Sequence, residues 1–277
     1  MRAAVIALLM LAGLAACDRA SEGRKAQVGN SVEQFSFEGA GSKDAAARIA
    51  HGRRLADVLD CTGCHGANLQ GTDLAEKPED GAMYAPNVTL LLAKYSDAEF
   101  DRLIRHGEPK DGREFWFMPV EGFQFLSDAD LAALIAYLRT IKPAGKALPP
   151  FRFNRVEQRD VDRGLLGNAQ AQIRKYRDDP PVDMGDEHAW GRYMVRTTCT
   201  ACHNNALQGW TDFTPDLDIA GAYSPAELDT LLTTGKGKSK PDLGMMSEMG
   251  RRVFSRLTPR ERQTIIAYVK ARANRQQ

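Results

Sequence analysis

The chain has 277 residues, of which 43% are hydrophobic, so it is long enough to form one large domain or two small ones with buried cores. Lysine and arginine number 37 against 36 aspartates and glutamates, which removes the electrostatic basis for nonspecific binding to a polyanion. Nucleic acid is therefore excluded as an expected partner.

Residues 1–16 are predicted to be an export signal. Arg2 is followed by an apolar stretch, residues 3–14, that is too short to span a bilayer comfortably. The stretch runs into Leu14-Ala15-Ala16-Cys17, which resembles the lipobox of bacterial lipoproteins, where the cysteine is lipidated and becomes the mature N-terminus. Lipid on Cys17 would anchor the protein on the periplasmic side of a bacterial membrane without a spanning helix. The alternative is an ordinary cleaved signal with a chance cysteine near the cut.

Residues 17–43 are predicted to be the lipidated N-terminus and a flexible tether, because they are rich in glycine, serine and charge and lack sustained periodicity. From about residue 44 the chain is a repeat. Cys61-Thr62-Gly63-Cys64-His65 recurs 138 residues later as Cys199-Thr200-Ala201-Cys202-His203. A short helical pattern that contains a glycine, Gly52 or Gly191, precedes each motif.

Two further helices are predicted behind each motif, and their start and stop signals match between the halves. A serine with a glutamate three residues later is a capping box, in which both side chains satisfy free backbone N–H groups. Glycine at the other end favours helix termination. The matching positions are Ser96 and Ser224, Glu99 and Glu227, Gly107 and Gly235, Ser127 and Thr258, and Asp130 and Glu261.

The predicted fold is therefore mainly α, with two tandem helical domains at residues 44–142 and 186–277. The long linker between them, residues 143–185, is rich in proline and charge. It is long for a plain loop, so we expect it to wrap across both domains and to include a helix near residues 160–175.

Each Cys-x-x-Cys-His motif predicts one covalently bound haem c, two in all. Two thiols at this spacing reach the two vinyl groups of a haem, and the next residue coordinates the iron. A zinc ribbon would need its cysteine pairs ~15 to 20 residues apart, and no thioredoxin-like strand pattern surrounds either motif. The predicted residues are Cys61, Cys64, His65, Cys199, Cys202 and His203.

Both halves resemble class I cytochrome c domains, and the tandem is similar to bacterial dihaem cytochromes related to the cytochrome subunits of membrane-bound alcohol dehydrogenases. Besides the motifs, the resemblance rests on Ala85-Pro86-Asn87-Val88-Thr89, on Met118-Pro119 and on Leu134-Ile135-Ala136-Tyr137-Leu138. In that family the first and last helices cross at a glycine and an aromatic residue. The resemblance implies that Gly52 meets Tyr137 and that Gly191 meets Tyr268.

Iron held by one histidine needs a sixth ligand, and a methionine thioether raises the reduction potential and blocks small molecules. In the first half the candidates are Met83 and Met118. Met118, followed by Pro119, matches the ligand loop of the family that the chain resembles. It is the predicted ligand.

In the second half three methionines compete as iron ligands, namely Met245, Met246 and Met249. Met246 is favoured because it lies 11 residues after the helix-ending glycine, as Met118 does in the first half. Met245 stays open as the alternative.

The second ring nitrogen of an iron-coordinating histidine needs an acceptor that fixes the ring. In the family that the chain resembles, a proline carbonyl is this acceptor. The resemblance therefore implies the carbonyl of Pro86 for His65 and that of Pro215 for His203. The other three histidines are interpreted as surface residues, and they are His51, His106 and His188.

No residue set predicts a catalytic site, and irons with two protein ligands leave no place for a small-molecule substrate. The predicted function is transfer of single electrons between a periplasmic or membrane donor and an acceptor such as a terminal oxidase. The predicted partners are redox proteins. Two alternatives stay open, namely a cytochrome subunit of a periplasmic dehydrogenase complex and a dihaem enzyme such as a peroxidase or a thiosulfate-oxidising cytochrome.

Overall fold

The computed structural model describes residues 35–75 and 82–275, so the predicted signal peptide and Cys17 lie outside the described residues. The described chain is mainly helical, as predicted. Within it we find one sheet of two short antiparallel strands, β1 (Thr72–Asp73) and β2 (Tyr84–Ala85).

The first repeat contains the three predicted helices, α1, α4 and α6, and three short additional ones. Ser96 and Glu99 form the predicted capping box, and Gly107 ends the same helix in the left-handed conformation, with φ 61°. Ser127 caps the last helix through the backbone N–H of Asp130. The helices are α1 (Ala45–Val58), α2 (Cys61–His65), α3 (Val88–Leu92), α4 (Asp97–His106), α5 (Val120–Phe123) and α6 (Asp128–Leu138).

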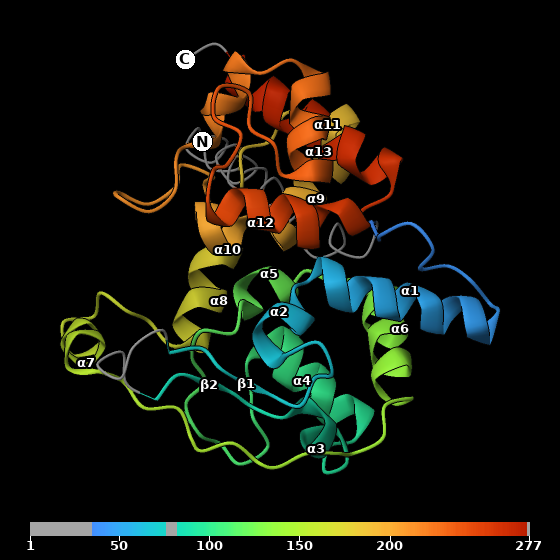
Figure 1. The fold of residues 1–277 in the computed structure, drawn as a ribbon, viewed down its shortest axis with the longest axis vertical. Helices are drawn as coiled ribbons and strands as arrows, with labels where there is room; N and C mark the ends of the chain where they lie inside the picture. The colour runs from blue at the N-terminus through green and yellow to red at the C-terminus, as the bar shows by residue number, and fades with distance from the viewer. Residues whose placement is uncertain (1–34, 76–81, 276–277) are drawn as a thin grey trace, which may run out of the picture. The chain divides into compact units, whose positions relative to one another are not determined.

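The second repeat follows the same order. Capping boxes start its two longer C-terminal helices at Ser224 and Thr258, and Gly235 ends the first of them with φ 75°. Its elements are η2 (Asp186–His188), α9 (Ala189–Thr198), α10 (Thr200–His203), η3 (Leu217–Ala222), α11 (Pro225–Thr234), α12 (Met245–Arg252), η4 (Phe254–Arg256) and α13 (Pro259–Ala273). Figure 1 shows these helices in orange to red and those of the first repeat in blue to green.

The first and last long helices of each repeat cross at a glycine. A side chain at Gly52 of α1 would overlap the backbone carbonyl of Ala133 in α6, and it would lie 2.9 Å from the Cβ of Tyr137. A side chain at Gly191 of α9 would lie 2.7 Å from the Cβ of Tyr268 in α13. The glycine–aromatic crossings implied by the family resemblance are therefore present in both repeats, and only glycine permits so close an approach.

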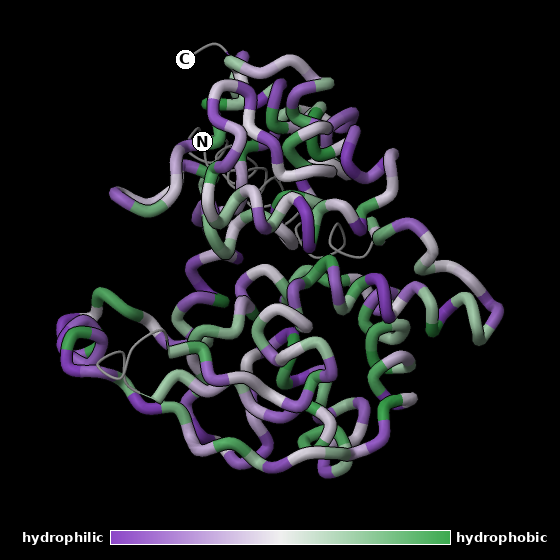
Figure 2. Tube along the Cα trace, in the orientation of Figure 1, coloured by the Kyte–Doolittle hydropathy of each residue, from purple (hydrophilic) through white to green (hydrophobic). Residues whose placement is uncertain are grey.

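The hydrophobic residues that recur at helical spacing form the core. Figure 2 shows them recurring along the helices of both repeats, and most of the buried ones form one contiguous cluster that includes both halves. The stripes of the last helices are buried as their spacing predicts. They comprise Leu131, Leu134, Ile135 and Leu138 in α6 and Ile265, Ile266, Tyr268 and Val269 in α13.

The linker contacts both repeats, but its helical content differs from the prediction. It forms two helices, α7 (Arg155–Asp162) and α8 (Ala169–Asp178), instead of one across residues 160–175. Gly164, with φ 70°, interrupts the pattern, and Asn168 caps the start of α8. The α8 helix packs on α4 and α5 of the first repeat, while the Tyr176 hydroxyl donates to the Thr200 carbonyl of the second at 3.3 Å.

The prediction of a flexible tether through residue 43 was wrong for residues 35–43, which belong to the fold. Phe37 is only 2% exposed, and its ring packs on the edge of Tyr193 with centroids 6.0 Å apart. The Phe37 amide donates to Asp130 at 3.0 Å, and the Glu38 amide donates to Glu261 at 2.8 Å. The two aromatic residues at 35 and 37 supply the apolar surface that the glycine-rich composition of this segment concealed.

Two fully buried carboxylates join the repeats in a matched way. Arg54, two residues after the crossing glycine of the first repeat, forms two hydrogen bonds of 2.7 and 3.0 Å with Glu261 of the second. Tyr193, two residues after the crossing glycine of the second repeat, donates to Asp130 of the first at 3.3 Å. Both carboxylates occupy the third position of the last helix of their repeat. The interface therefore follows the symmetry of the duplication.

His51 was predicted to be a surface residue, and this prediction was wrong. Its side chain is buried, with 5% exposure, and its Nε2 lies 2.8 Å from the buried carboxylate of Asp130. A buried histidine is retained where a partner satisfies its ring nitrogen.

Removal of the Asp130 carboxylate is expected to destabilise the protein strongly. Asp130→Ala leaves the Phe37 amide, the Ser127 hydroxyl and His51 without their buried acceptor. We expect a loss of about 3 kcal/mol in the free energy of unfolding, measured by urea denaturation of the haem-loaded protein. The matched control is Asp128→Ala in the same helix, where the side chain is 68% exposed and the expected change is below about 1 kcal/mol. Equal effects of the two substitutions would contradict the buried role of Asp130.

Candidate functional site

A single helical turn places the three side chains of each motif on one face. In α2, Cys61 lies three residues before Cys64 and four before His65, the spacings at which helical residues are neighbours. Asp60, with φ 57°, breaks α1 just before this turn. In the second repeat Cys199 both ends α9 and starts α10.

The loop that follows each histidine has the same backbone path in both repeats. Positive φ angles recur at three matched positions, and the residue at the second of them, Leu69 or Leu207, is fully buried. The carbonyl of Leu69 accepts from Val88 and that of Leu207 accepts from Leu217, both at 2.9 Å. This bond returns the chain to the histidine and places the preceding proline beside it.

Each motif histidine is oriented by a proline carbonyl. His65 Nδ1 lies 2.8 Å from the carbonyl oxygen of Pro86, and His203 Nδ1 lies 2.9 Å from that of Pro215. A carbonyl accepts only, so Nδ1 carries the proton and Nε2 keeps its lone pair. This tautomer is the one that a metal-coordinating imidazole needs when its second nitrogen is fixed.

Burial keeps the site groups neutral. It raises the pKa of Cys61 to about 12 and that of Cys199 to about 11, and it also raises the pKa of Cys64. Burial lowers the pKa of His65 and of His203, although the proline carbonyls oppose this shift. Free thiols and uncharged imidazoles are therefore the resting forms at neutral pH.

The candidate methionine ligands sit in different local structures. Met118 directly precedes α5, with Pro119 as the N-terminal cap, whereas Met246 lies in the first turn of α12. Both side chains are half-buried and pack against the core. Met245 is 55% exposed, and Met83 is not among the residues that pack on the core. The packing thus distinguishes Met246 from its neighbour.

The donor set of each repeat fits a covalently held haem. Two unpaired thiols share a helix face with a neutral imidazole, and a thioether is available on a later helix or loop. Among the described residues no group of three or more histidine, cysteine, aspartate or glutamate side chains could hold a separate metal ion. Chemically, thiols at this spacing form thioethers with haem vinyl groups, and the remaining nitrogen ligates iron.

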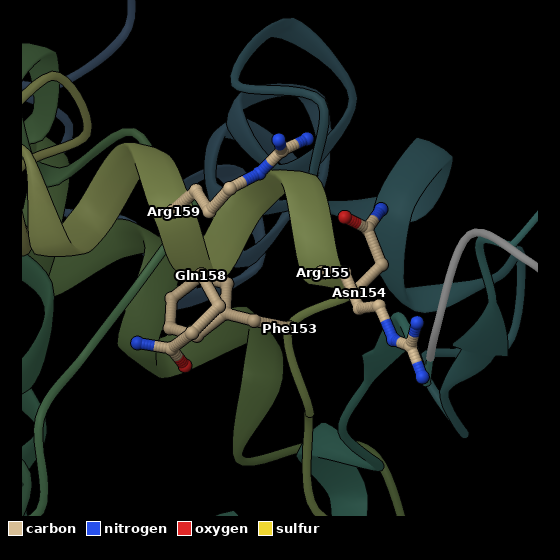
Figure 3. Close-up of a pocket in the computed structure, with 5 residues that line it drawn as sticks. All are labelled: Phe153, Asn154, Arg155, Gln158 and Arg159. Carbon is tan, nitrogen blue, oxygen red and sulfur yellow. The ribbon is translucent and has the colours of Figure 1, made fainter.

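An open hollow on the linker lies outside this donor set. Figure 3 shows its lining, which comes from α7 and the residues just before it, and none of these residues belongs to a Cys-x-x-Cys-His motif. The lining residues are Phe153, Asn154, Arg155, Gln158 and Arg159.

Glu121 in α5 was not singled out from the sequence, and its burial has a consequence for stability. Burial raises its pKa to about 7 from an ordinary value of 4.5. A raised carboxyl pKa means that the folded state favours the protonated form, so stability is lost as the pH rises from about 4.5 to about 7. Glu121→Gln should remove this loss and make the protein more stable than wild type by about 2 kcal/mol at pH 8.

Urea denaturation of the haem-loaded protein between pH 4.5 and pH 8 measures the effect of Glu121→Gln. The control is the exposed Glu108, where the same substitution leaves the stability profile unchanged. A constant difference between Glu121→Gln and wild type over this range would show that the carboxyl does not titrate as described.

The duplicated helical fold and its paired thiol–imidazole sites define a class of helical proteins that bind haem covalently. The family model described as Cytochrome c matches residues 49–142 and 189–273, more than half of the chain. The chain belongs to the cytochrome c family, which implies covalently bound haem c and electron transfer as its function.

Several curated relatives carry related sequence. The chain is 26% identical to the fructose dehydrogenase cytochrome subunit of Gluconobacter japonicus over 80% of this chain and 52% of the relative. It is 33% identical to the cytochrome c subunit of a quinone alcohol dehydrogenase of Gluconacetobacter polyoxogenes over 63% of this chain and 39% of the relative. It is 27% identical to the gluconate 2-dehydrogenase cytochrome c subunit of Pantoea cypripedii over 76% of this chain and 51% of the relative. The chain thus spans about two fifths to one half of the length of these relatives.

Proposed function

We propose that each repeat holds one haem c and that the protein passes single electrons through the pair. The first haem is attached at Cys61 and Cys64 and ligated by His65 and Met118. The second is attached at Cys199 and Cys202, with His203 and Met246 as iron ligands. The observation that carries the proposal is the repeated geometry of motif, buried loop leucine and proline carbonyl.

The chain's own residues set up the site for this chemistry. Haem, when bound, supplies an iron that changes between the ferric and ferrous states by one electron. The carbonyls of Pro86 and Pro215 keep each histidine in the tautomer that can bind iron. The thioethers of Met118 and Met246 would supply the second protein ligand of each iron, which would favour the reduced state and exclude a small-molecule substrate.

The donor is a periplasmic or membrane protein, and the acceptor is a protein such as a terminal oxidase. Within the described residues no helix is long and apolar enough to cross a bilayer. The proposed attachment to the periplasmic side of the membrane is through lipid at Cys17, since acyl chains anchor a protein without a spanning helix. Cys17→Ala should release the protein from the membrane fraction and leave its haem content unchanged. Retention of the variant in washed membranes would refute the anchor.

A second candidate function is that of a cytochrome subunit in a dehydrogenase complex. The named relatives favour it, because each is a cytochrome subunit of a fructose, alcohol or gluconate dehydrogenase. Purification of the tagged chain from mildly solubilised membranes separates the two functions. A large dehydrogenase subunit at equal stoichiometry would select the complex, whereas a lone chain that reduces an oxidase in membrane vesicles would select the carrier. Failure of the pure chain to exchange electrons with any such partner would refute both.

A further inference from the structure

Each haem-attachment motif contacts the helix that carries or follows the candidate methionine ligand of the other repeat. The α10 helix contacts α5, which begins directly after Pro119. On the other side Asp60, the residue before Cys61, forms an ion pair with Arg252 at the end of α12. Figure 1 shows α12 and α10 facing α2 and α5 across the boundary between the repeats. The attachment motif of each candidate site is therefore in contact with the methionine region of the other repeat.

Arg252 is held from both repeats. Its guanidinium contacts both carboxylate oxygens of Asp60, with Nη2 at 3.2 Å from Oδ2. Within its own helix Nε lies 3.4 Å from Glu248, and Nη2 lies 3.8 Å from the sulfur of Met249. A two-point pair between a planar guanidinium and a carboxylate fixes direction as well as distance.

Gly63 provides the space for this arginine. A Cβ at Gly63 would overlap both the Arg252 guanidinium and the Asp60 carboxylate. The equivalent position of the second motif is Ala201, which is exposed. The one difference between the two x-x pairs of the motifs thus coincides with the arginine contact.

The opposite crossing combines close backbone packing with one arginine–aromatic contact. A Cβ at Gly122 of α5 would lie 3.3 Å from the carbonyl oxygens of Arg196 and Thr197 at the end of α9. The Arg196 guanidinium lies 3.3 Å from the centre of the Phe125 ring. Backbone packing therefore supports this side, whereas the Asp60–Arg252 contact is made by side chains alone, so that one substitution removes it.

We propose that Asp60 and Arg252 are positioning residues for electron exchange between the two haems, because they hold the attachment helix of the first against the methionine helix of the second. The inference rests on the proposed function. In each exchange one electron leaves a ferrous iron, which becomes ferric, and reduces the other ferric iron. No bond is formed or broken and no proton moves.

The test is the rate of intramolecular electron exchange after flash reduction of the haem-loaded protein. Arg252→Met removes the charge and keeps the length of the side chain, and Gly63→Ala displaces the guanidinium without removing a charge. We expect exchange to slow roughly tenfold in both, because small displacements of reacting groups have large effects on rate. Arg252→Lys should restore most of the rate, because an ammonium can still pair with Asp60.

The matched control is Arg262→Gln, which breaks the 2.9 Å pair with Asp229 inside the second repeat and should leave the exchange rate unchanged. Haem content and the methionine-to-iron absorption band are measured on every variant. An exchange rate within twofold of wild type in both Arg252→Met and Gly63→Ala, with two haems bound, would refute the positioning role alone. A wild-type protein with fewer than two haems would refute the proposed function and the positioning role together.

Discussion

Substitution of the cysteines of one motif is expected to halve the covalently bound haem. In Cys61→Ser with Cys64→Ser, the first repeat can form no thioether bonds, while the second motif keeps two free thiols beside His203. The haem retained on a denaturing gel and the haem absorbance per chain should both fall to about half of the wild-type value. The result follows because the two donor sets share no residue.

The reciprocal variants control this experiment. Cys199→Ser with Cys202→Ser should likewise halve the covalently bound haem per chain. All four substitutions together should abolish covalent haem. Cys17→Ser removes the one cysteine that lies outside the two motifs and should leave haem content at the wild-type level. Complete loss of haem from either double variant, in soluble folded protein, would contradict independent attachment.

Loss of a methionine ligand is expected to lower one reduction potential and leave the other near its wild-type value. Met118→Ala removes the proposed thioether ligand of the first repeat, and Met246→Ala removes that of the second. Each substitution should lower one potential by roughly 100 mV or more, since the axial ligand is the main determinant of haem potential. Redox titration followed optically measures both potentials in a single sample.

Met245→Ala is the matched control, because Met245 is the neighbour of Met246 in the same helical turn but is 55% exposed. It should leave both potentials unchanged. A fall in potential in Met245→Ala, with none in Met246→Ala, would exchange the assignment of the two residues. Unchanged potentials in both variants and in Met118→Ala would refute thioether ligation.

The duplicated fold was predictable because its signals are local. The capping boxes at Ser96 and Ser224 and the terminating glycines at 107 and 235 depend on neighbours within a few residues. The buried stripes follow from helical periodicity, and the structure confirms them. The 11-residue spacing matched Met246 to Met118 as a candidate iron ligand, although it did not reveal that Met246 lies in the first turn of a helix.

The long-range contacts within and between the repeats could not be predicted, because they join residues far apart in sequence. Nothing near His51 indicates that Asp130 lies 2.8 Å away, and Arg54 pairs with a glutamate 207 residues later. Residues 35–43 were mistaken for a tether because their glycines and charges outweigh two phenylalanines in any compositional measure. Only tertiary structure shows that Phe37 enters the core.

The potentiometric titration of the purified wild-type protein, followed by its visible spectrum, is the most direct test of two haems held by histidine and methionine. We expect two one-electron steps per chain and low-spin iron throughout, with the methionine-to-iron band present at the intensity of two haems. One electron per chain, or high-spin iron in the native protein, would contradict this expectation.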